Sequence, residues 1–185
     1  MHSKLILIAS LGLAAAATAQ TFQIPRDLAD GAYIVSLDHN SASVFTQLEH
    51  NTTAVARRGD AEVQRRQVSF PSGSGAVCNQ PLVNDNDMFG AGQAWDQMFN
   101  ACSNLGGAFL KNKQALFFKA GTATAFMCNY SSKGNPCNTA EWEQAIGNVR
   151  NACADGSNGR DQTGYFNIPG WKKSYGFTQS SLGFC

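Results

Sequence analysis

All six cysteines of this chain lie C-terminal to the dibasic pair Arg65-Arg66, and all three histidines lie N-terminal to it. An even number of cysteines is typical of a small exported domain, and here it predicts three disulfides. Because the C-terminal part lacks histidine, it has neither an imidazole base nor a histidine metal ligand. The split therefore constrains both fold and chemistry. The cysteines are Cys78, Cys102, Cys128, Cys137, Cys153 and Cys185.

The first residues have the pattern of a secretory signal peptide. His2 and Lys4 precede an apolar run from Leu5 to Ala17, and the run ends at the small-residue sequence Ala17-Thr18-Ala19. It is shorter than the roughly 20 residues that a membrane-spanning helix needs. We expect residues 1–19 to be removed and the protein to be secreted and extracellular.

Residues 20–66 have the features of a propeptide. They hold no cysteine, carry an N-glycosylation sequon at Asn51 and end in Arg65-Arg66, which is a typical processing signal of the secretory pathway. The turn-rich stretch 69–75 follows the pair and favours cleavage there. Cleavage leaves residues 67–185 as the mature disulfide-rich domain. The alternative is that Arg65 and Arg66 are ordinary surface arginines.

One part of this propeptide has a structural pattern of its own. Asp30-Gly31 predicts a turn, and the alternation of apolar residues from Ala32 to Leu37 predicts a strand after it. We therefore expect the propeptide to shield the domain during folding.

Two segments of residues 67–185 have helical periodicity. The first runs from about Asp87 to Leu105 and ends at Gly106-Gly107; the second runs from about Thr139 to Ala154, with Asn138 or Thr139 as its N-cap. Their apolar stripes include Trp95 and Trp142, which we assign to the core.

Both helices end in the tripeptide Asn-Ala-Cys, and two strand-like runs follow each of them. The runs cover residues 108–119, 122–130, 164–168 and 174–178. Two helices and four or more strands bury their apolar faces most simply when both helices pack on the same side of a sheet. The predicted fold is α+β, a two-layer sandwich with two helices on one face of an antiparallel sheet and three disulfides.

The repeated pattern also suggests a disulfide pairing. If the two helix-strand-strand units are equivalent, each helical cysteine pairs within its own unit, as Cys102–Cys128 and Cys153–Cys185. This leaves Cys78–Cys137 as the third bridge. The alternative is that the tripeptides match by chance, which leaves the pairing open.

The acidic residues give little indication of catalysis. Asp85, Asp87, Glu141 and Glu143 fall at predicted helix starts, where capping and the helix dipole explain them. Residues 85–96 match a calcium loop only in part, since several ligand positions are replaced. We predict no catalytic residue, no metal and no cofactor. The alternative is a small carboxylate-dependent hydrolase or a cell-wall glycan-binding module.

The turn at residues 169–173 is the segment in which an exposed aromatic side chain is most expected. We predict that Trp171, Lys172 and Lys173 contact a partner. Asn129 lies in a second sequon and is a candidate glycosylation site. Six lysines and two arginines against seven acids leave no basic patch in the mature part, so a nucleic-acid partner is not expected.

The order of the motifs resembles that of a known group of proteins. A signal peptide and a dibasic-ended propeptide precede residues 128–131 (Cys-Asn-Tyr-Ser), residues 135–137 (Asn-Pro-Cys), a helix ending in Cys153, Gly164-Tyr165 and residues 173–176 (Lys-Ser-Tyr-Gly). Over residues 67–185 this layout resembles the killer-toxin-like α/β-sandwich group, which includes virally encoded fungal killer toxins and effectors of plant-pathogenic fungi. The resemblance implies a mostly non-enzymatic protein and carries over no catalytic residue.

We therefore expect a secreted fungal effector or toxin-like protein that acts without catalysis. The resemblance implies that it binds an extracellular target, which is a host or microbial protein, a membrane or a component of a cell wall, and that it has a role in virulence or competition.

Overall fold

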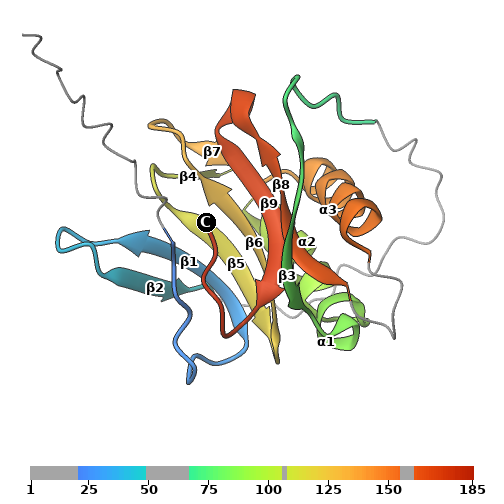
Figure 1. The fold of residues 1–185 in the computed structure, drawn as a ribbon. Helices are drawn as coiled ribbons and strands as arrows, with labels where there is room; N and C mark the ends of the chain where they lie inside the picture. The colour runs from blue at the N-terminus through green and yellow to red at the C-terminus, as the bar shows by residue number, and fades with distance from the viewer. Residues whose placement is uncertain (1–20, 49–66, 106–107, 155–160) are drawn as a thin grey trace, which may run out of the picture.

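A seven-stranded antiparallel sheet organises the structure, a computed structural model that describes residues 21–48, 67–105, 108–154 and 161–185 (Figure 1). Its strand order in these residues is β2-β1-β5-β6-β9-β8-β3. The predicted signal peptide, Asn51, Arg65 and Arg66 lie outside the described residues. The strands are β1 (Gly31–Leu37), β2 (Ser43–Gln47), β3 (Gly75–Leu82), β5 (Ala115–Ala120), β6 (Ala123–Asn129), β8 (Gln162–Ile168) and β9 (Lys173–Gln179).

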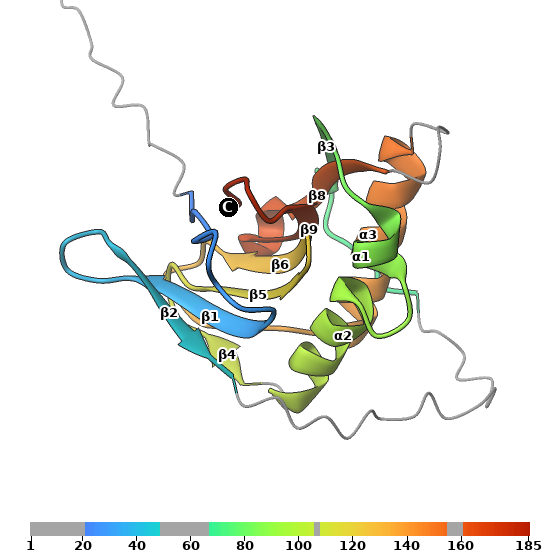
Figure 2. The same cartoon turned by 90° about the horizontal axis from the view of Figure 1, so that it is seen from below.

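Three α-helices pack on one side of this sheet (Figure 2). They are α1 (Asp85–Phe89), α2 (Ala94–Asn104) and α3 (Thr139–Cys153). Of the two predicted caps, Asn138 is the one that caps α3, because its side chain accepts hydrogen bonds from the first backbone N–H groups of the helix. A short ribbon of β4 (Phe109–Leu110) and β7 (Asn135–Pro136) and a 3-10 turn, η1 (Pro169–Trp171), complete the described elements.

The first predicted helix is present as two helices with a break between them. Gly90 ends α1, and its N–H donates to the carbonyl of Asn86. A Cβ at Gly90 would lie 2.4 Å from that same carbonyl oxygen, so only glycine allows this close approach. Gly92 then takes a φ of +73°, which glycine adopts without strain. The local glycines therefore redirect the chain before α2 begins.

The predicted fold class is confirmed: the described chain is an α+β sandwich with an antiparallel sheet, helices on one face and three disulfides. The two helix-strand-strand units lie symmetrically in the sheet, with β6 and β9 as neighbours at its centre. α2 packs on β5 and β6, and α3 packs on β8 and β9. The repeat seen in the sequence thus corresponds to an arrangement in space.

The predicted disulfide pairing is wrong. The bridges are Cys78–Cys153, Cys102–Cys137 and Cys128–Cys185, with Cα–Cα distances of 5.5, 5.0 and 5.8 Å. No bridge lies within one helix-strand-strand unit. Cys78 of β3 meets Cys153 at the end of α3, because β3 lies beside β8 and packs against α3. Cys102 of α2 meets Cys137, which precedes α3, and Cys128 of β6 meets Cys185, which follows β9, the neighbour of β6.

The sheet has an apolar core on each of its faces. The helix-covered face buries Trp142, Ile146 and Leu116 among others, whereas the second face, on the side away from the helices, has its own cluster. Alternation along β5 supplies both cores, since Leu116 faces the helices and Phe117 faces the other way. The buried residues of the second face are Phe22, Ile24, Tyr33, Val35, Ala115, Phe117, Phe126, Cys128 and Phe184.

The strand predicted at residues 32–37 is present as β1, and it is part of the main sheet. β1 pairs with β5 in antiparallel register from Gly31↔Lys119 to Val35↔Ala115, and β2 pairs with β1 on its outer side. Part of the predicted propeptide is therefore built into the same sheet as the disulfide-rich domain.

Candidate functional site

One end of the sheet gathers most of the exposed loops and the residues that the sequence singled out. The register places the first residue of β5, the last residues of β6 and β8 and the first residue of β9 at this end. We call it the loop end and define it by residues 109–114, 129–136 and 169–172. The β4-β7 ribbon and the β8-β9 turn lie together there, at the top of the sheet in Figure 1.

Asn129, at the end of β6, holds the loop end together. Its Nδ2 donates to the carbonyl oxygens of Leu110, Lys111 and Lys133 at 2.9, 2.8 and 3.2 Å. Its Oδ1 accepts from the backbone N–H of Ser131 at 2.9 Å and from Asn135 Nδ2 at 2.7 Å. One buried amide thus fixes two backbone segments, residues 110–111 and 131–133, and the side chain of Asn135. Because its polar atoms are all hydrogen-bonded, the free-energy cost of burying it is offset.

The interpretation of Asn129 as a candidate glycosylation site conflicts with this geometry. The nitrogen that would bear the sugar is the Nδ2 that donates to three carbonyls, and the side chain is only 3 % exposed. A glycan at this atom is incompatible with the described fold. The other predicted sequon, Asn51, lies outside the described residues.

The turn that carries Trp171 and Lys172 is tied to this asparagine network. Asn135 Nδ2 also donates to the carbonyl of Trp171 at 2.9 Å, and the N–H of Tyr130 donates to the carbonyl of Lys172 at 2.8 Å. Lys172 takes a left-handed conformation with φ +52° and is exposed, while Trp171 is half-buried against Phe70. Lys172 therefore lies where a partner can reach it, and Trp171 offers only part of its ring.

Lys173 is not available to a partner, so that part of the prediction is wrong. It is buried, and its Nζ forms an ion pair with Glu141 at 2.5 Å. Tyr175 Oη donates to the same carboxylate at 2.9 Å. Lys173, Tyr175 and Phe177 alternate along β9 and share the helix-covered face, which directs the lysine inward. The cluster joins the start of α3 to β9.

The tyrosine in this cluster has a strongly perturbed acidity. Burial, and then the negative charge of Glu141, raise the pKa of Tyr175 well above 10.0. Tyr175 therefore stays protonated and keeps donating to the carboxylate. Because Lys173 and Glu141 neutralise each other at the inner side of the sheet, the cluster is a structural link between a helix and a strand.

Other exposed groups at the loop end were not singled out by the sequence. Phe109 is 64 % exposed and Tyr130 is 43 % exposed, which makes them two of the large apolar side chains most open to solvent in the described chain. Phe109 stands over Gly134, where a Cβ would lie 2.6 Å from Phe109 Cβ. Partial burial raises the pKa of Tyr130, and its hydrogen bond to Ser174 opposes the shift.

Exposed lysines are also found on the loops of the loop end. Lys111, Lys113, Lys133 and Lys172 are all exposed at the loop end. Acidic side chains at the opposite end of the sheet form ion pairs or hydrogen bonds with other residues of the protein. They lie near the β5-β6 turn and the starts of β1 and β8. The pairs that show this are Asp30 with Lys119, Asp87 with Thr122, Asp85 with the N–H of Asp161, and Asp161 with Arg150. The loop end is therefore both aromatic and basic.

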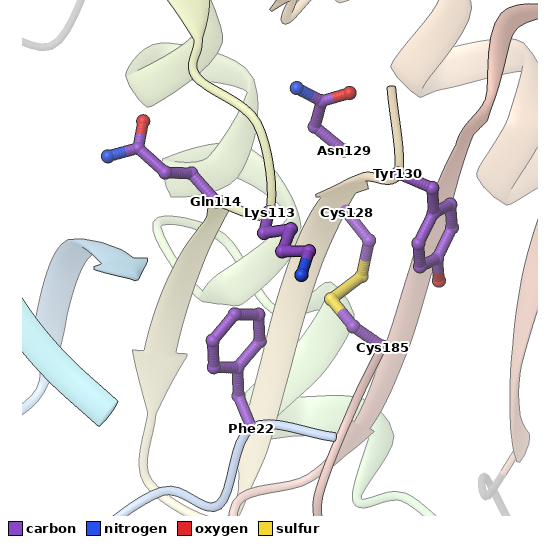
Figure 3. Close-up of a pocket in the computed structure, with 7 residues that line it drawn as sticks. All are labelled: Phe22, Lys113, Gln114, Cys128, Asn129, Tyr130 and Cys185. Carbon is purple, nitrogen blue, oxygen red and sulfur yellow. A yellow bond between two sulfur atoms is a disulfide. The ribbon is translucent and has the colours of Figure 1, made fainter. Parts of the chain in front are cut away.

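A small hollow lies beside the loop end on the second face (Figure 3). Its cavity volume is only about 10 Å³, far below the roughly 300–1,000 Å³ of typical small-molecule pockets. The N-terminal part of the chain contributes Phe22 to its wall. Its lining consists of Phe22, Lys113, Gln114, Cys128, Asn129, Tyr130 and Cys185.

The carboxylates considered for a hydrolase do not converge at this site. Asp87 binds the N–H of Thr122 at the β5-β6 turn, whereas Glu141 binds Lys173 at the start of β9. The described residues contain no group of three or more His, Cys, Asp or Glu side chains placed to hold a metal ion. None of the described helices is long and apolar enough to cross a membrane.

Comparisons of the chain with protein-family models, with curated proteins and with solved structures found no significant match. The function is therefore argued from the loop end itself. What its geometry offers is a surface: two exposed aromatic side chains and several lysines, on loops that a buried asparagine network holds in place.

Proposed function

We propose that this chain is an exported, non-catalytic protein of the effector or toxin-like type, and that it binds an acidic surface of an extracellular host or microbial protein through its loop end. One observation carries the proposal: the loops fixed by Asn129 expose two aromatic side chains, Phe109 and Tyr130, and several lysines. Three disulfides support an extracellular setting, because such bonds persist in oxidising compartments.

The chemistry of the surface selects the kind of partner. Aromatic side chains contribute strongly to binding when they enter pockets of a partner, and lysines speed the encounter with an acidic surface. The loops are held by hydrogen bonds before binding, so little conformational freedom is lost on association. A protein surface with an apolar pocket and an acidic rim fits these properties.

The test uses the full secreted chain and compares loop-end variants with the unmodified protein in two biological assays. Leaves infiltrated with purified protein, and cultures of competing fungi, give the dose required for a half-maximal response. The double variant Phe109→Ala/Tyr130→Ala should raise that dose by about tenfold or more, because each truncation removes on the order of 1 kcal/mol or more of contact. Lys111→Glu/Lys172→Glu should raise it as well, and more strongly at low salt.

Val77→Ala is the matched control, because Val77 is an exposed apolar residue on β3, away from the loop end. It should act like the unmodified protein. Inert behaviour of the unmodified protein in both assays would overturn the proposal, as would full activity of both loop-end variants. Turnover on a glycan panel would favour the hydrolase alternative. Binding to lipid vesicles or wall polysaccharide that is lost in the loop-end variants would show that the target is a membrane or a wall component and not a protein.

A further inference from the structure

The residues before the dibasic pair form an integral part of the sheet in the intact chain. We call residues 21–48 the N-terminal segment. Its strand β1 lies between β2 and β5, so it covers the edge of β5 with a ladder of backbone hydrogen bonds. Without it, β5 would be an edge strand with a row of unpaired N–H and C=O groups.

The N-terminal segment also supplies nearly half of the core on the second face. Phe22, Ile24, Tyr33 and Val35 are all buried there. The ring of Tyr33 stacks on Phe117 with centroids 5.2 Å apart. These contacts cover an apolar surface of the disulfide-rich domain that would otherwise face water. The partners from that domain are Ala115, Phe117, Phe126, Cys128 and Phe184.

Polar contacts fasten the two ends of this region. At one end, Asp30 accepts from Lys119 Nζ at 2.6 Å and from the N–H of Gly121 at 2.9 Å. At the other end, Phe22 and Phe184 exchange two backbone hydrogen bonds of 2.8 and 3.0 Å. The N-terminal segment holds no cysteine, so no disulfide links it to the rest of the protein.

We propose that the N-terminal segment stays bound after cleavage at Arg65-Arg66, so that the processed protein is a noncovalent assembly of two chains. Residues 67–185 then act as a strand acceptor, with the β5 edge and the second face as the binding site. The occupant is the protein's own N-terminal segment, which completes the sheet as a donated strand. The predicted propeptide is on this view a subunit and not a discarded piece.

The proposal has a consequence for the loop end. Phe22 forms part of the wall of the hollow beside Lys113 and Tyr130, so the processed protein keeps that wall only if the segment stays. The inference does not depend on the proposed partner, because retention of the segment is measured on the isolated protein.

The experiment cleaves the purified full chain with a kexin-type endoprotease and passes the product over a size-exclusion column under native conditions. Intact masses are then measured for each peak. We expect both chains in one peak at equal amounts, and their separation only after denaturant is added. Elution of the segment as a free peptide would overturn the proposal, and so would a folded chain that the protease does not cut at this pair.

Two valine variants give a matched comparison. Val35 is buried in β1, whereas Val44, in the neighbouring strand β2, is 46 % exposed. After cleavage, Val35→Arg should release the segment at least tenfold faster than the unmodified protein, and Val44→Arg should leave its release unchanged. Equal retention of the segment in both variants would contradict the binding mode.

A second measurement covers the case in which Val35→Arg fails to fold. Hydrogen exchange of the β5 amides is compared before and after cleavage of the unmodified protein. We expect the protection of β5 to persist, because β1 still covers its edge. Loss of protection in β5 with protection retained in β6 would show that the edge has opened, and it would overturn the proposal.

Discussion

The two faces of the sheet are built in different ways. On the helix-covered face the core comes mainly from residues 67–185, with α2 and α3 packed on neighbouring strands and the Cys102–Cys137 disulfide and Cys153 within the cluster. On the second face no helix of the described chain covers the strands, and the core consists of the N-terminal segment, the chain end around Phe184 and the outward side chains of β5 and β6. One face is covered by helices that lie close to its strands in sequence, and the other is covered by the N-terminal and C-terminal parts of the described chain.

This difference shows which part of the fold is expected to be autonomous. A helix that lies close to its strands in sequence buries its apolar face as soon as the unit forms. The second face requires segments far apart in the chain to meet, as Phe22 and Phe184 do. Its stability should therefore depend on the N-terminal segment, whereas that of the helix-covered face should not.

The largest expected effects come from truncating two adjacent residues of β5. Leu116→Ala removes a buried side chain from the helix-covered face, and Phe117→Ala removes one from the second face. In the intact chain each should lower the free energy of unfolding by about 3–5 kcal/mol, as for other large-to-small core changes. Chemical denaturation followed by circular dichroism measures both.

Cleavage and removal of the N-terminal segment under denaturing conditions, followed by refolding, should separate the two variants. Phe117 would then face solvent, so its truncation should cost much less than before, while the cost of Leu116→Ala should persist. Equal costs in the shortened protein would mean that the second face closes without the segment.

The next effect in size comes from the Cys128–Cys185 bridge. It holds the chain end so that Phe184 stacks on Phe126, with ring centroids 5.0 Å apart. Cys128→Ala/Cys185→Ala should lower the free energy of unfolding by about 2–4 kcal/mol. All three tryptophans belong to the helix-covered face or pack against it, so their fluorescence in the folded state should stay unchanged.

The matched variant removes the Cys78–Cys153 bridge, which ties the last residue of α3 to β3. Cys78→Ala/Cys153→Ala should cost a similar free energy and should shift tryptophan emission. The same spectral change in both variants would contradict the separation of the two faces.

A smaller effect is expected at Gly176 in the middle of β9. A Cβ there would lie 2.6 Å from the carbonyl oxygen of Gly164 and 2.6 Å from the ring of Phe126, so the residue has no room for a side chain. Gly176→Ala should cost about 1–3 kcal/mol, the usual range for overpacking a core. Gly147 in α3 has open space at its Cβ, and Gly147→Ala should be neutral or stabilising. Equal stability changes in the two variants would contradict the packing of Phe126 over β9.

Local signals in the sequence were enough for the elements and for the fold class. Apolar alternation predicted β1, and helical spacing with Asn138 as the cap predicted α3. The disulfide pairing was not accessible in this way, because it depends on which strands become neighbours, β9 beside β6 and β3 beside β8, and no local pattern specifies this. The break between α1 and α2 had a local signal in Gly90 and Gly92, but the apolar spacing on either side masked it.

For the candidate site, the turn at residues 169–173 was predicted from its residues, but the direction of its side chains was not. Alternation along β9 was a sufficient signal that Lys173 faces inward with Tyr175. The sequon at Asn129 gave no indication that its side chain is buried, because an asparagine that donates to three carbonyls has no distinctive sequence pattern. Phe109 was expected to lie in a strand, and its exposure follows from the position of the β4-β7 ribbon at the rim of the fold.

The smallest expected effects are changes of stability with pH, and they report on the two faces separately. Asp30, which fastens the N-terminal segment, is partly buried, yet hydrogen bonds from Lys119 and Gly121 hold its pKa below 3.8. Its contribution is therefore present above that pH and lost as the pH falls further. Because the carboxylate is more than half exposed, the loss should be only about 0.2–1 kcal/mol.

Tyr175 on the helix-covered face has the opposite dependence. Its pKa is raised in the folded protein, so its contribution is complete below pH 10.0 and is lost as the pH rises beyond that value. Asp30→Asn should reduce only the loss of unfolding free energy at acid pH, and Tyr175→Phe should reduce only the loss at alkaline pH. If the processed protein holds its N-terminal segment as proposed, the segment should also be released faster at acid pH, because the ion pair that is lost lies between the segment and β5.

If Asp30→Asn loses as much stability at acid pH as the unmodified protein, another carboxylate is responsible for this pH dependence. Asp30 would then not contribute to the attachment of the segment.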